Sequence, residues 1–300
     1  MKKIPIIIDC DPGVDDVLAI ILANSDKKFD IRAMTSVSGN VSIEKTTYNL
    51  RLVSALLSIN CPIAKGAHKP LKREAVIADE VHGSDGFGGL SSLITDVKLK
   101  DLSEFDAVDL IANTIKESDE KITIIAVGPL TNIAQFTLKY PDLLNKVKEI
   151  SIMGGGVKNG NITEHAEFNF YVDPEAAKIV MNCGIPIILS SLDVTLQAYL
   201  TDEDQLELSS IKNKVATIAN KAMFEYTRYD PAIHDPISIL ALSSPELFES
   251  VELCIDIETQ EIKRGKSFIV ENGKKNCKFI TTIDRNKFVN RLKESLSYYN

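Results

Sequence analysis

Several features are scarce in this 300-residue sequence, and each scarcity argues against a class of protein. The five cysteines lie far apart and form no CxxC pair, which argues against a zinc ribbon and a disulfide framework. No apolar run reaches the length of a membrane span, and Asp9 and Asp11 interrupt the first run too early for a signal peptide. Basic residues form no cluster, and the net charge is −8. We therefore expect a cytoplasmic protein that binds neither nucleic acid nor membrane.

The sequence does contain a regular alternation of short apolar runs and amphipathic stretches. Nearly continuous β-branched runs predict buried strands at 4–8, 31–37, 61–64, 122–127, 150–153 and 185–191. Helical patterns occupy 14–25, 42–58, 104–118, 131–139, 174–182 and 203–225, and the C-terminal part adds a helix after Pro236, a hairpin around 272–276 and a helix near 285–297. We predict one α/β domain over residues 1–300, with a mostly parallel central sheet, helices on both faces and a small C-terminal β-hairpin.

An acidic cluster follows the first predicted strand. The segment DCDPGVDD places Asp9, Asp11, Asp15 and Asp16 at the junction of a buried strand and a buried helix. Helix capping accounts for one or two of these acids, but not for four. Two like charges about 4 Å apart repel by roughly 4 kcal/mol at an effective dielectric constant near 20, so shared protons or a cation must neutralise them. Oxygen donors without a nearby His or Cys favour Ca²⁺ or Mg²⁺.

DCDPGVDD resembles the N-terminal fingerprint of the inosine–uridine-type nucleoside hydrolases. The family's other motifs follow in the family's order, namely SGN (38–40), VGPLTNIA (127–134), MGGG (153–156), GNITEHAEFNFYVDPEAA (160–177) and HDP (234–236). The resemblance covers nearly the whole chain. It implies a Rossmann-like nucleoside hydrolase fold and an enzyme of nucleoside salvage, which hydrolyses the N-glycosidic bond of ribonucleosides to free base and ribose.

The resemblance also implies one Ca²⁺ per chain at the bottom of the pocket. Its ligands would be three carboxylates and one backbone carbonyl: Asp11, Asp16, Asp235 and Val127. Asp15 corresponds to the general base that takes a proton from the calcium-bound water, and Asn40 lines the pocket near that nucleophile. Asp9 would orient the other acids from behind. Asp235 also fits a helix N-cap position before Pro236, and the two roles are compatible.

Sugar and base contacts follow from the later motifs. By resemblance, Asn161 and Glu167 hold the 5′-hydroxyl, Asn169 holds the 2′/3′ edge of the ribose, and Met153 forms a pocket wall. We expect 167–170 to be extended, with Glu167 and Asn169 on one side. Taken singly, Met153 is more often a core residue and Asn161 a turn residue. Thr131 fits a helix N-cap without a catalytic role.

Four further residues are candidates for handling the base. His234 neighbours Asp235 and would protonate the leaving base, although a solitary histidine is more often structural. His82, in a Gly-rich loop that resembles a mobile flap, is a weaker candidate for contacting the base. Tyr226 and Tyr229 could stack on the base or simply pack at a helix end.

Base preference and competing functions remain open at this level. The absence of tryptophan argues against the purine-preferring subgroup, which leaves an inosine/uridine-accepting or pyrimidine-preferring enzyme. A phosphoryl-transfer enzyme would need basic residues beside GPLTNIA or MGGG, and none flanks either turn. A catalytically silent nucleoside or ribose sensor is the remaining alternative. The resemblance implies a homodimer or homotetramer.

Overall fold

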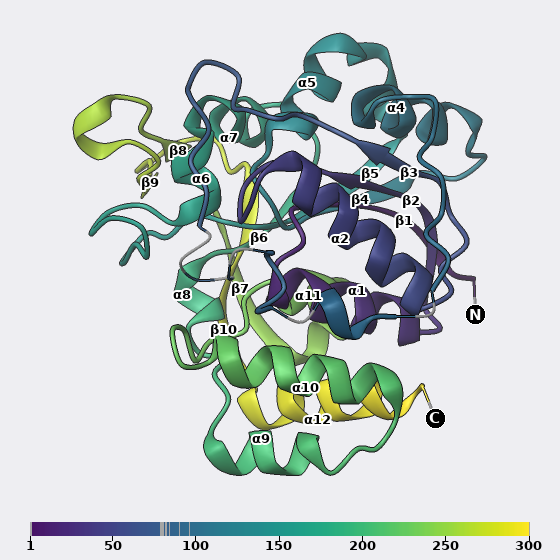
Figure 1. Ribbon diagram of the computed structural model, residues 1–300. Coiled ribbons are helices and arrows are strands. Elements are labelled where there is room, and N and C mark those ends of the chain that lie inside the picture. Colours follow the sequence, from purple (N-terminus) through teal and green to yellow (C-terminus); the bar gives the residue numbers. More distant parts are fainter. Residues whose placement is uncertain are drawn as a thin grey trace.

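The computed structural model describes residues 2–78, 81, 83, 85–89, 91–95 and 97–299. An eight-stranded sheet with the order β3-β2-β1-β4-β5-β6-β10-β7 forms its centre (Figure 1). Neighbouring strands are parallel except for β10 and the edge strand β7, which are antiparallel. The strands are β1 (Ile4–Cys10), β2 (Phe29–Ser36), β3 (Ile63–Lys65), β4 (Ile122–Ala126), β5 (Val147–Met153), β6 (Ile187–Ser190), β7 (Phe248–Leu253) and β10 (Cys277–Ile283). The predicted α/β class with a mostly parallel sheet is confirmed.

Helices cover both faces of this sheet, because alternate side chains of its strands point to opposite sides. Ile6 and Ile8 of β1 belong to one core cluster and Ile7 to the other. On the first face lie α1 (Val14–Ser25), α2 (Ile43–Leu56), α10 (Lys214–Tyr226), α11 (Pro236–Ser243) and α12 (Arg285–Ser297). On the second face lie α4 (Ala107–Glu117), α5 (Thr131–Lys139) and α7 (Pro174–Met181). The remaining labelled α-helices are α6 (Phe168–Val172), α8 (Leu192–Thr195) and α9 (Asp202–Ser209), and the described residues also form four 3₁₀ helices: Ser91–Leu93, Pro141–Lys146, Pro245–Leu247 and Glu261–Lys263.

The C-terminal half differs from the sequence prediction in two places. The single helix predicted over 203–225 is wrong, because the chain breaks between α9 and α10, where the Asn213 side chain accepts a hydrogen bond from the Ala216 N–H and starts the second helix. The predicted small hairpin exists, but it is formed by β8 (Ile255–Ile257) and β9 (Ser267–Ile269), so residues 258–266 form its connection. Residues 270–276 instead connect β9 to β10, which belongs to the central sheet.

The strand order predicts a functional site at the carboxyl ends of β1 and β4. From β1 the chain continues to β2 on one side, whereas β4 pairs with β1 on the other side. Ligands collect at the carboxyl ends of strands at such a reversal, because the following loops diverge there. The acidic segment follows β1, and residues 127–130 follow β4. Among the described residues, none of the helices combines the length and the hydropathy needed to span a bilayer.

Candidate active site

The acidic segment turns sharply from β1 into α1. Asp16 organises this turn: its Oδ1 accepts a hydrogen bond from the Asp11 N–H (3.0 Å) and its Oδ2 from the Gly13 N–H (2.9 Å). The Asn40 side chain donates a third bond to Asp16 Oδ2 (3.0 Å), and the Asn40 N–H donates to Asp11 Oδ2 (2.7 Å). A carboxylate at N3 of a helix is favourably placed for these bonds. The turn therefore fixes two acids and one amide in a single network.

Glycines bring the neighbouring loops close to Asp11. A Cβ at Gly128 would lie 2.5 Å from Asp11 Oδ1, and a Cβ at Gly39 would lie 2.1 Å from Asp11 Oδ2. No side chain fits at either position without displacing the carboxylate. The loops after β2 and β4 thus confine Asp11 from two sides.

The acids are buried together, at an electrostatic cost. Asp11, Asp15, Asp16 and Asp235 are each no more than 5 % exposed. Burial, followed by the charge of Asp15, raises the pKa of Asp16 to about 7. Burial and the neighbouring acids raise the pKa values of Asp11 and Asp235 well above their usual range. Behind them, Asp9 accepts hydrogen bonds from Thr35 (2.5 Å) and Asn132 (2.8 Å), and burial still raises its pKa to about 7.

This cluster suits a hard divalent cation. One oxygen from each of Asp15, Asp16 and Asp235 lies within 4.8 Å of the others. Asp11 Oδ1 and Asp15 Oδ1 are buried without a hydrogen-bond partner in the described part of the chain. Buried polar atoms are normally bonded, so two orphaned carboxylate oxygens at one place indicate a missing positive group. The donors are all oxygens, as Ca²⁺ and Mg²⁺ prefer.

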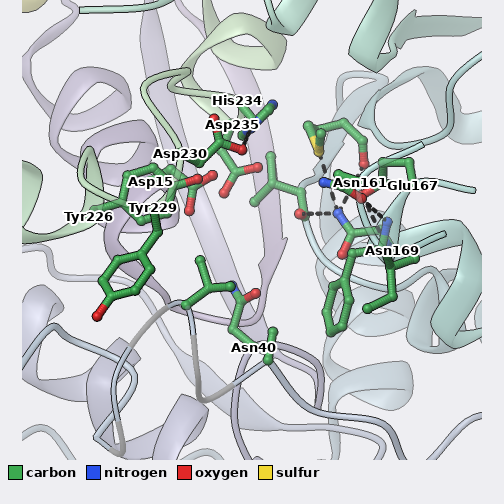
Figure 2. A pocket seen from close by; sticks show the side chains of 16 residues that line it. Asp15, Asn40, Asn161, Glu167, Asn169, Tyr226, Tyr229, Asp230, His234 and Asp235 are labelled. Carbon is green, nitrogen blue, oxygen red and sulfur yellow. Dashed lines mark hydrogen bonds and ion pairs between the residues drawn. The ribbon is translucent and has the colours of Figure 1, made fainter. Parts of the chain in front are cut away.

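Two of these acids, Asp15 and Asp235, line a cavity of about 210 Å³, and Asn40 also lines it (Figure 2). Val127 is a further lining residue. Asp235 sits at the N-cap position before Pro236, but its side chain makes no capping bond. The Val127 carbonyl accepts a hydrogen bond from the Asn169 side chain (2.8 Å), which leaves its second lone pair available.

A polar wall faces the acids across this cavity, with Asn161, Glu167 and Asn169 opposite Asp15 and Asp235 (Figure 2). Glu167 is fully buried and accepts three backbone N–H bonds, from Asn169 (2.8 Å), Gly155 (2.7 Å) and Phe170 (3.1 Å). Burial raises the pKa of Glu167 in spite of these bonds.

Two other predicted residues join this polar wall. Met153 lines the cavity, and its carbonyl lies 3.3 Å from the Asn169 amide nitrogen. Asn161 is exposed, and its Oδ1 accepts a bond from the Phe168 N–H (2.9 Å).

His234 lies on the side of the cavity that α10 and the following turn form, and each of its ring nitrogens has a hydrogen-bond partner. Nδ1 lies 2.7 Å from the Thr195 hydroxyl, and Nε2 lies 3.0 Å from Asp230 Oδ2. Burial alone would lower the pKa of His234, but the hydrogen bond to Asp230 and the charges of Asp230 and Asp15 raise it above its usual value. Tyr226 is buried and Tyr229 is 68 % exposed at the rim, and both line the cavity.

Some sequence predictions for this site need correction. The extended conformation predicted for 167–170 is wrong, because Glu167 caps the short helix α6 with its own carboxylate; Glu167 and Asn169 nevertheless both face the cavity. The N-cap prediction for Thr131 is also wrong, because Leu130 holds that position and the Thr131 hydroxyl donates to Asp173 (2.7 Å). His82 lies outside the described residues, so its predicted contact with the base stays a prediction.

The sequence analysis did not identify Asp230 or Thr195. Asp230 lines the cavity and stands four residues before His234, in the non-helical segment between α10 and α11. Because this segment is not helical, the spacing of four residues did not predict the contact. Thr195 offered no signal either, because it comes from α8, 39 residues away in sequence.

Comparison with known proteins identifies the family. The model of the family described as inosine–uridine preferring nucleoside hydrolase matches residues 6–290. The pyrimidine-specific ribonucleoside hydrolase RihA of Escherichia coli (strain K12) is 40 % identical over 311 residues, covering 99 % of each chain. Among solved structures, the plant nucleoside hydrolase PpNRh1 has a TM-score of 0.90 at 30 % identity over 98 % of each chain. An inosine–guanosine nucleoside hydrolase has a TM-score of 0.88 at 26 % identity over 99 % of each chain.

These findings confirm the predicted fold and the predicted enzyme class, a ribonucleoside N-glycosidase. The chain belongs to the inosine–uridine preferring nucleoside hydrolase family.

Proposed function

We propose that this enzyme hydrolyses pyrimidine ribonucleosides in preference to purine ribonucleosides, and that it serves nucleoside salvage in the cytoplasm. The relative of 40 % identity is pyrimidine-specific. The base side of the cavity carries Tyr226, Tyr229 and His234, and the chain has no tryptophan to stack on a larger purine. We also propose that the chain acts as a homodimer or homotetramer, which sedimentation would test.

The observation that carries the proposal is the convergence of Asp15, Asp16 and Asp235 at a cavity that Asp15 and Asp235 line, together with buried, unpartnered carboxylate oxygens on Asp11 and Asp15. We propose that Asp11, Asp16, Asp235 and the Val127 carbonyl hold one Ca²⁺, with Asp15 at its edge. A cation there would lower the pKa of an adjacent water and bind the ribose hydroxyls. The buried acids also suit the positive charge that develops at the anomeric carbon as the base departs.

In this proposal Asp15 is the general base. It is 5 % exposed, lines the cavity, and its Oδ1 has no hydrogen-bond partner among the described residues. Asn40 lines the cavity beside Asp15 and holds two of the proposed ligands, Asp11 and Asp16, by hydrogen bonds. A positioned base contributes about 10²- to 10⁴-fold to such a step.

The leaving base receives its proton from His234 in this proposal. Asp230 favours the imidazolium, and Thr195 fixes the ring at its other nitrogen. A proton donor next to the departing base avoids the release of an anion.

On the opposite wall, Asn161 and Glu167 bind the ribose 5′-hydroxyl and Asn169 binds the 2′/3′ edge, while Met153 packs against the sugar. Glu167 can accept a further bond there, because a carboxylate has about four acceptor sites and three are used. Asp9 orients the other acids in this proposal, and Thr35 and Asn132 hold its own carboxylate in place by hydrogen bonds.

The test measures reducing sugar released from uridine, cytidine, inosine and adenosine by the wild type, Asp15→Asn and Asp11→Asn. We expect uridine and cytidine to be preferred. We expect Asp15→Asn, which removes the proposed general base, to lose at least about 10²-fold in kcat. The matched control is Asp109→Asn, which removes a carboxylate bound to Lys139 on the surface of α4.

Chelation followed by Ca²⁺ replacement belongs to the same experiment. No release from any ribonucleoside by calcium-loaded wild type would contradict the catalytic proposal and leave the nucleoside sensor. Because Asp11 is a proposed ligand, Asp11→Asn should lose activity together with Ca²⁺ affinity, whereas Asp15→Asn should lose kcat and still bind Ca²⁺.

A further inference from the structure

The β8–β9 hairpin contributes no residue to the cavity, yet it packs against the segments that carry the sugar wall. It lies beside α6 and α7 at the edge of the molecule (Figure 1). Ala166, directly before Glu167, forms an isolated antiparallel bridge with Lys266 of the hairpin. Ile255 and Ile257 of β8 share a core cluster with Phe170 of α6. The hairpin therefore contacts the chain on both sides of Glu167 and Asn169.

Arg264 makes the most specific of these contacts. Its Nε donates to the Tyr171 carbonyl (2.8 Å) and its Nη2 to the Val172 carbonyl (3.0 Å), and its guanidinium lies 4.3 Å from the centre of the Tyr171 ring. These carbonyls end α6, where no further turn of helix supplies donors. Because α6 has only five residues, its N-terminal cap Glu167 lies just over one turn from this clamp.

The backbone beside Arg264 fits closely against the same helix. Gly265 has φ = +77°, and a Cβ there would lie 2.6 Å from Tyr171 Cα. Ser267 packs against Gly155, where an added Cβ would lie 2.5 Å from the Ser267 hydroxyl. Gly155 donates one of the three N–H bonds to Glu167. The hairpin thus packs against Gly155, which donates a hydrogen bond to the Glu167 carboxylate, and also against α6, the helix that Glu167 caps.

A second arginine fixes the hairpin in place. Arg73 makes a bidentate bond to Glu175 of α7 (3.0 and 2.9 Å), donates to the Thr259 carbonyl (2.6 Å), and pairs with Glu261. A planar, bidentate guanidinium is a rigid connection. Arg73 therefore links the connection of the hairpin to α7, the helix that follows α6.

We propose that the β8–β9 hairpin is a positioning element of the sugar subsite, and that Arg264 is a positioning residue that acts through α6 on Glu167. This inference rests on the proposed function, in which Glu167 binds the 5′-hydroxyl of the ribose. It assigns Arg264 no contact with substrate. A displacement of Glu167 would weaken recognition of the 5′-hydroxyl and leave the chemistry at the acids and at His234 in place.

The experiment compares kcat/KM for uridine and 5′-deoxyuridine in the wild type, Arg264→Ala, Arg264→Lys and Glu167→Gln. We expect the wild type to prefer uridine by about tenfold or more, since a hydrogen bond to a charged group is lost with the 5′-hydroxyl. In Arg264→Ala that ratio should fall by at least about threefold, mainly through KM for uridine, and Arg264→Lys should recover part of it. In Glu167→Gln the ratio should also fall.

The matched control is Arg291→Ala, which removes a half-buried arginine bound to Asp26 and Glu294 far from the cavity. Its ratio should equal that of the wild type. An equal loss for both substrates in Arg264→Ala and Arg264→Lys would overturn the inference, because it indicates general destabilisation. A wild type that binds uridine without cleaving it would overturn the proposed function instead, and the ratio of Kd values for the two nucleosides would then test the hairpin.

Discussion

The strongest physical prediction concerns the stability of the calcium-free enzyme as the pH rises. Burial raises the pKa of Asp16 from 3.8 to about 7. An acid whose pKa is raised by folding contributes stability below its unfolded pKa and loses it as the pH rises through its folded pKa. A shift of about three units corresponds to roughly 4 kcal/mol, lost between about pH 4 and pH 7. A cation bound to Asp16 would hold the carboxylate ionised and cancel this loss.

The assay is thermal unfolding at several pH values between 5 and 8, with excess chelator or with saturating Ca²⁺. For a chain of this length, roughly 4 kcal/mol corresponds to about 6 °C in Tm. About two thirds of this loss falls between pH 5 and pH 8, so we expect the rise in Tm caused by Ca²⁺ to grow by about 4 °C over the range. In Asp16→Asn the growth should be smaller, because only Asp11 and Asp235, whose pKa values are also raised, remain to supply it.

The control for this prediction is Asp9→Asn. The pKa of Asp9 is also about 7, but its Oδ1 is bound by Thr35 and Asn132 and it is not one of the proposed Ca²⁺ ligands. Its contribution to the pH dependence should persist with Ca²⁺ present, so the Ca²⁺-induced shift should stay pH-dependent in Asp9→Asn. A Ca²⁺-induced shift that does not vary with pH in the wild type would refute the reasoning.

Three further predictions follow from the cavity. Gly128→Ala should weaken Ca²⁺ binding by calorimetry at least about tenfold, because the new Cβ would displace Asp11. Asp230→Asn should move the alkaline limb of the kcat/KM profile to lower pH, because Asp230 raises the pKa of His234; an unmoved limb would show that another group sets it. Uridine 5′-phosphate should be cleaved at least about 10²-fold more slowly than uridine. Its phosphate would meet the negative charge of Glu167, and the described residues that line the cavity include no Lys or Arg to bind it. Equal rates for the two substrates in the sugar-release assay would contradict this prediction.

Much of the fold could be predicted because its signals are local. The helix predicted over 14–25 is observed with the same limits, and so is the helix over 131–139. Apolar runs buried on both faces identify parallel strands directly. The C-terminal region was predicted less well, because β7 has alternating exposure at the sheet edge and β8 has only three residues. The break between α9 and α10 depends on one capping residue, Asn213.

The sequence by itself determined the family, the acidic cluster and the list of candidate ligands, because each motif is a short run of residue types with its own chemistry. Tertiary structure alone decided how those runs meet: that Asp15, Asp16 and Asp235 converge although 219 residues separate the last two, and that Asp230 and Thr195 hold His234 from two sides. It also decided that α6 is clamped by Arg264 from a hairpin outside the cavity. Such pairings depend on the packing of distant elements, and periodicity or spacing along the chain does not encode them.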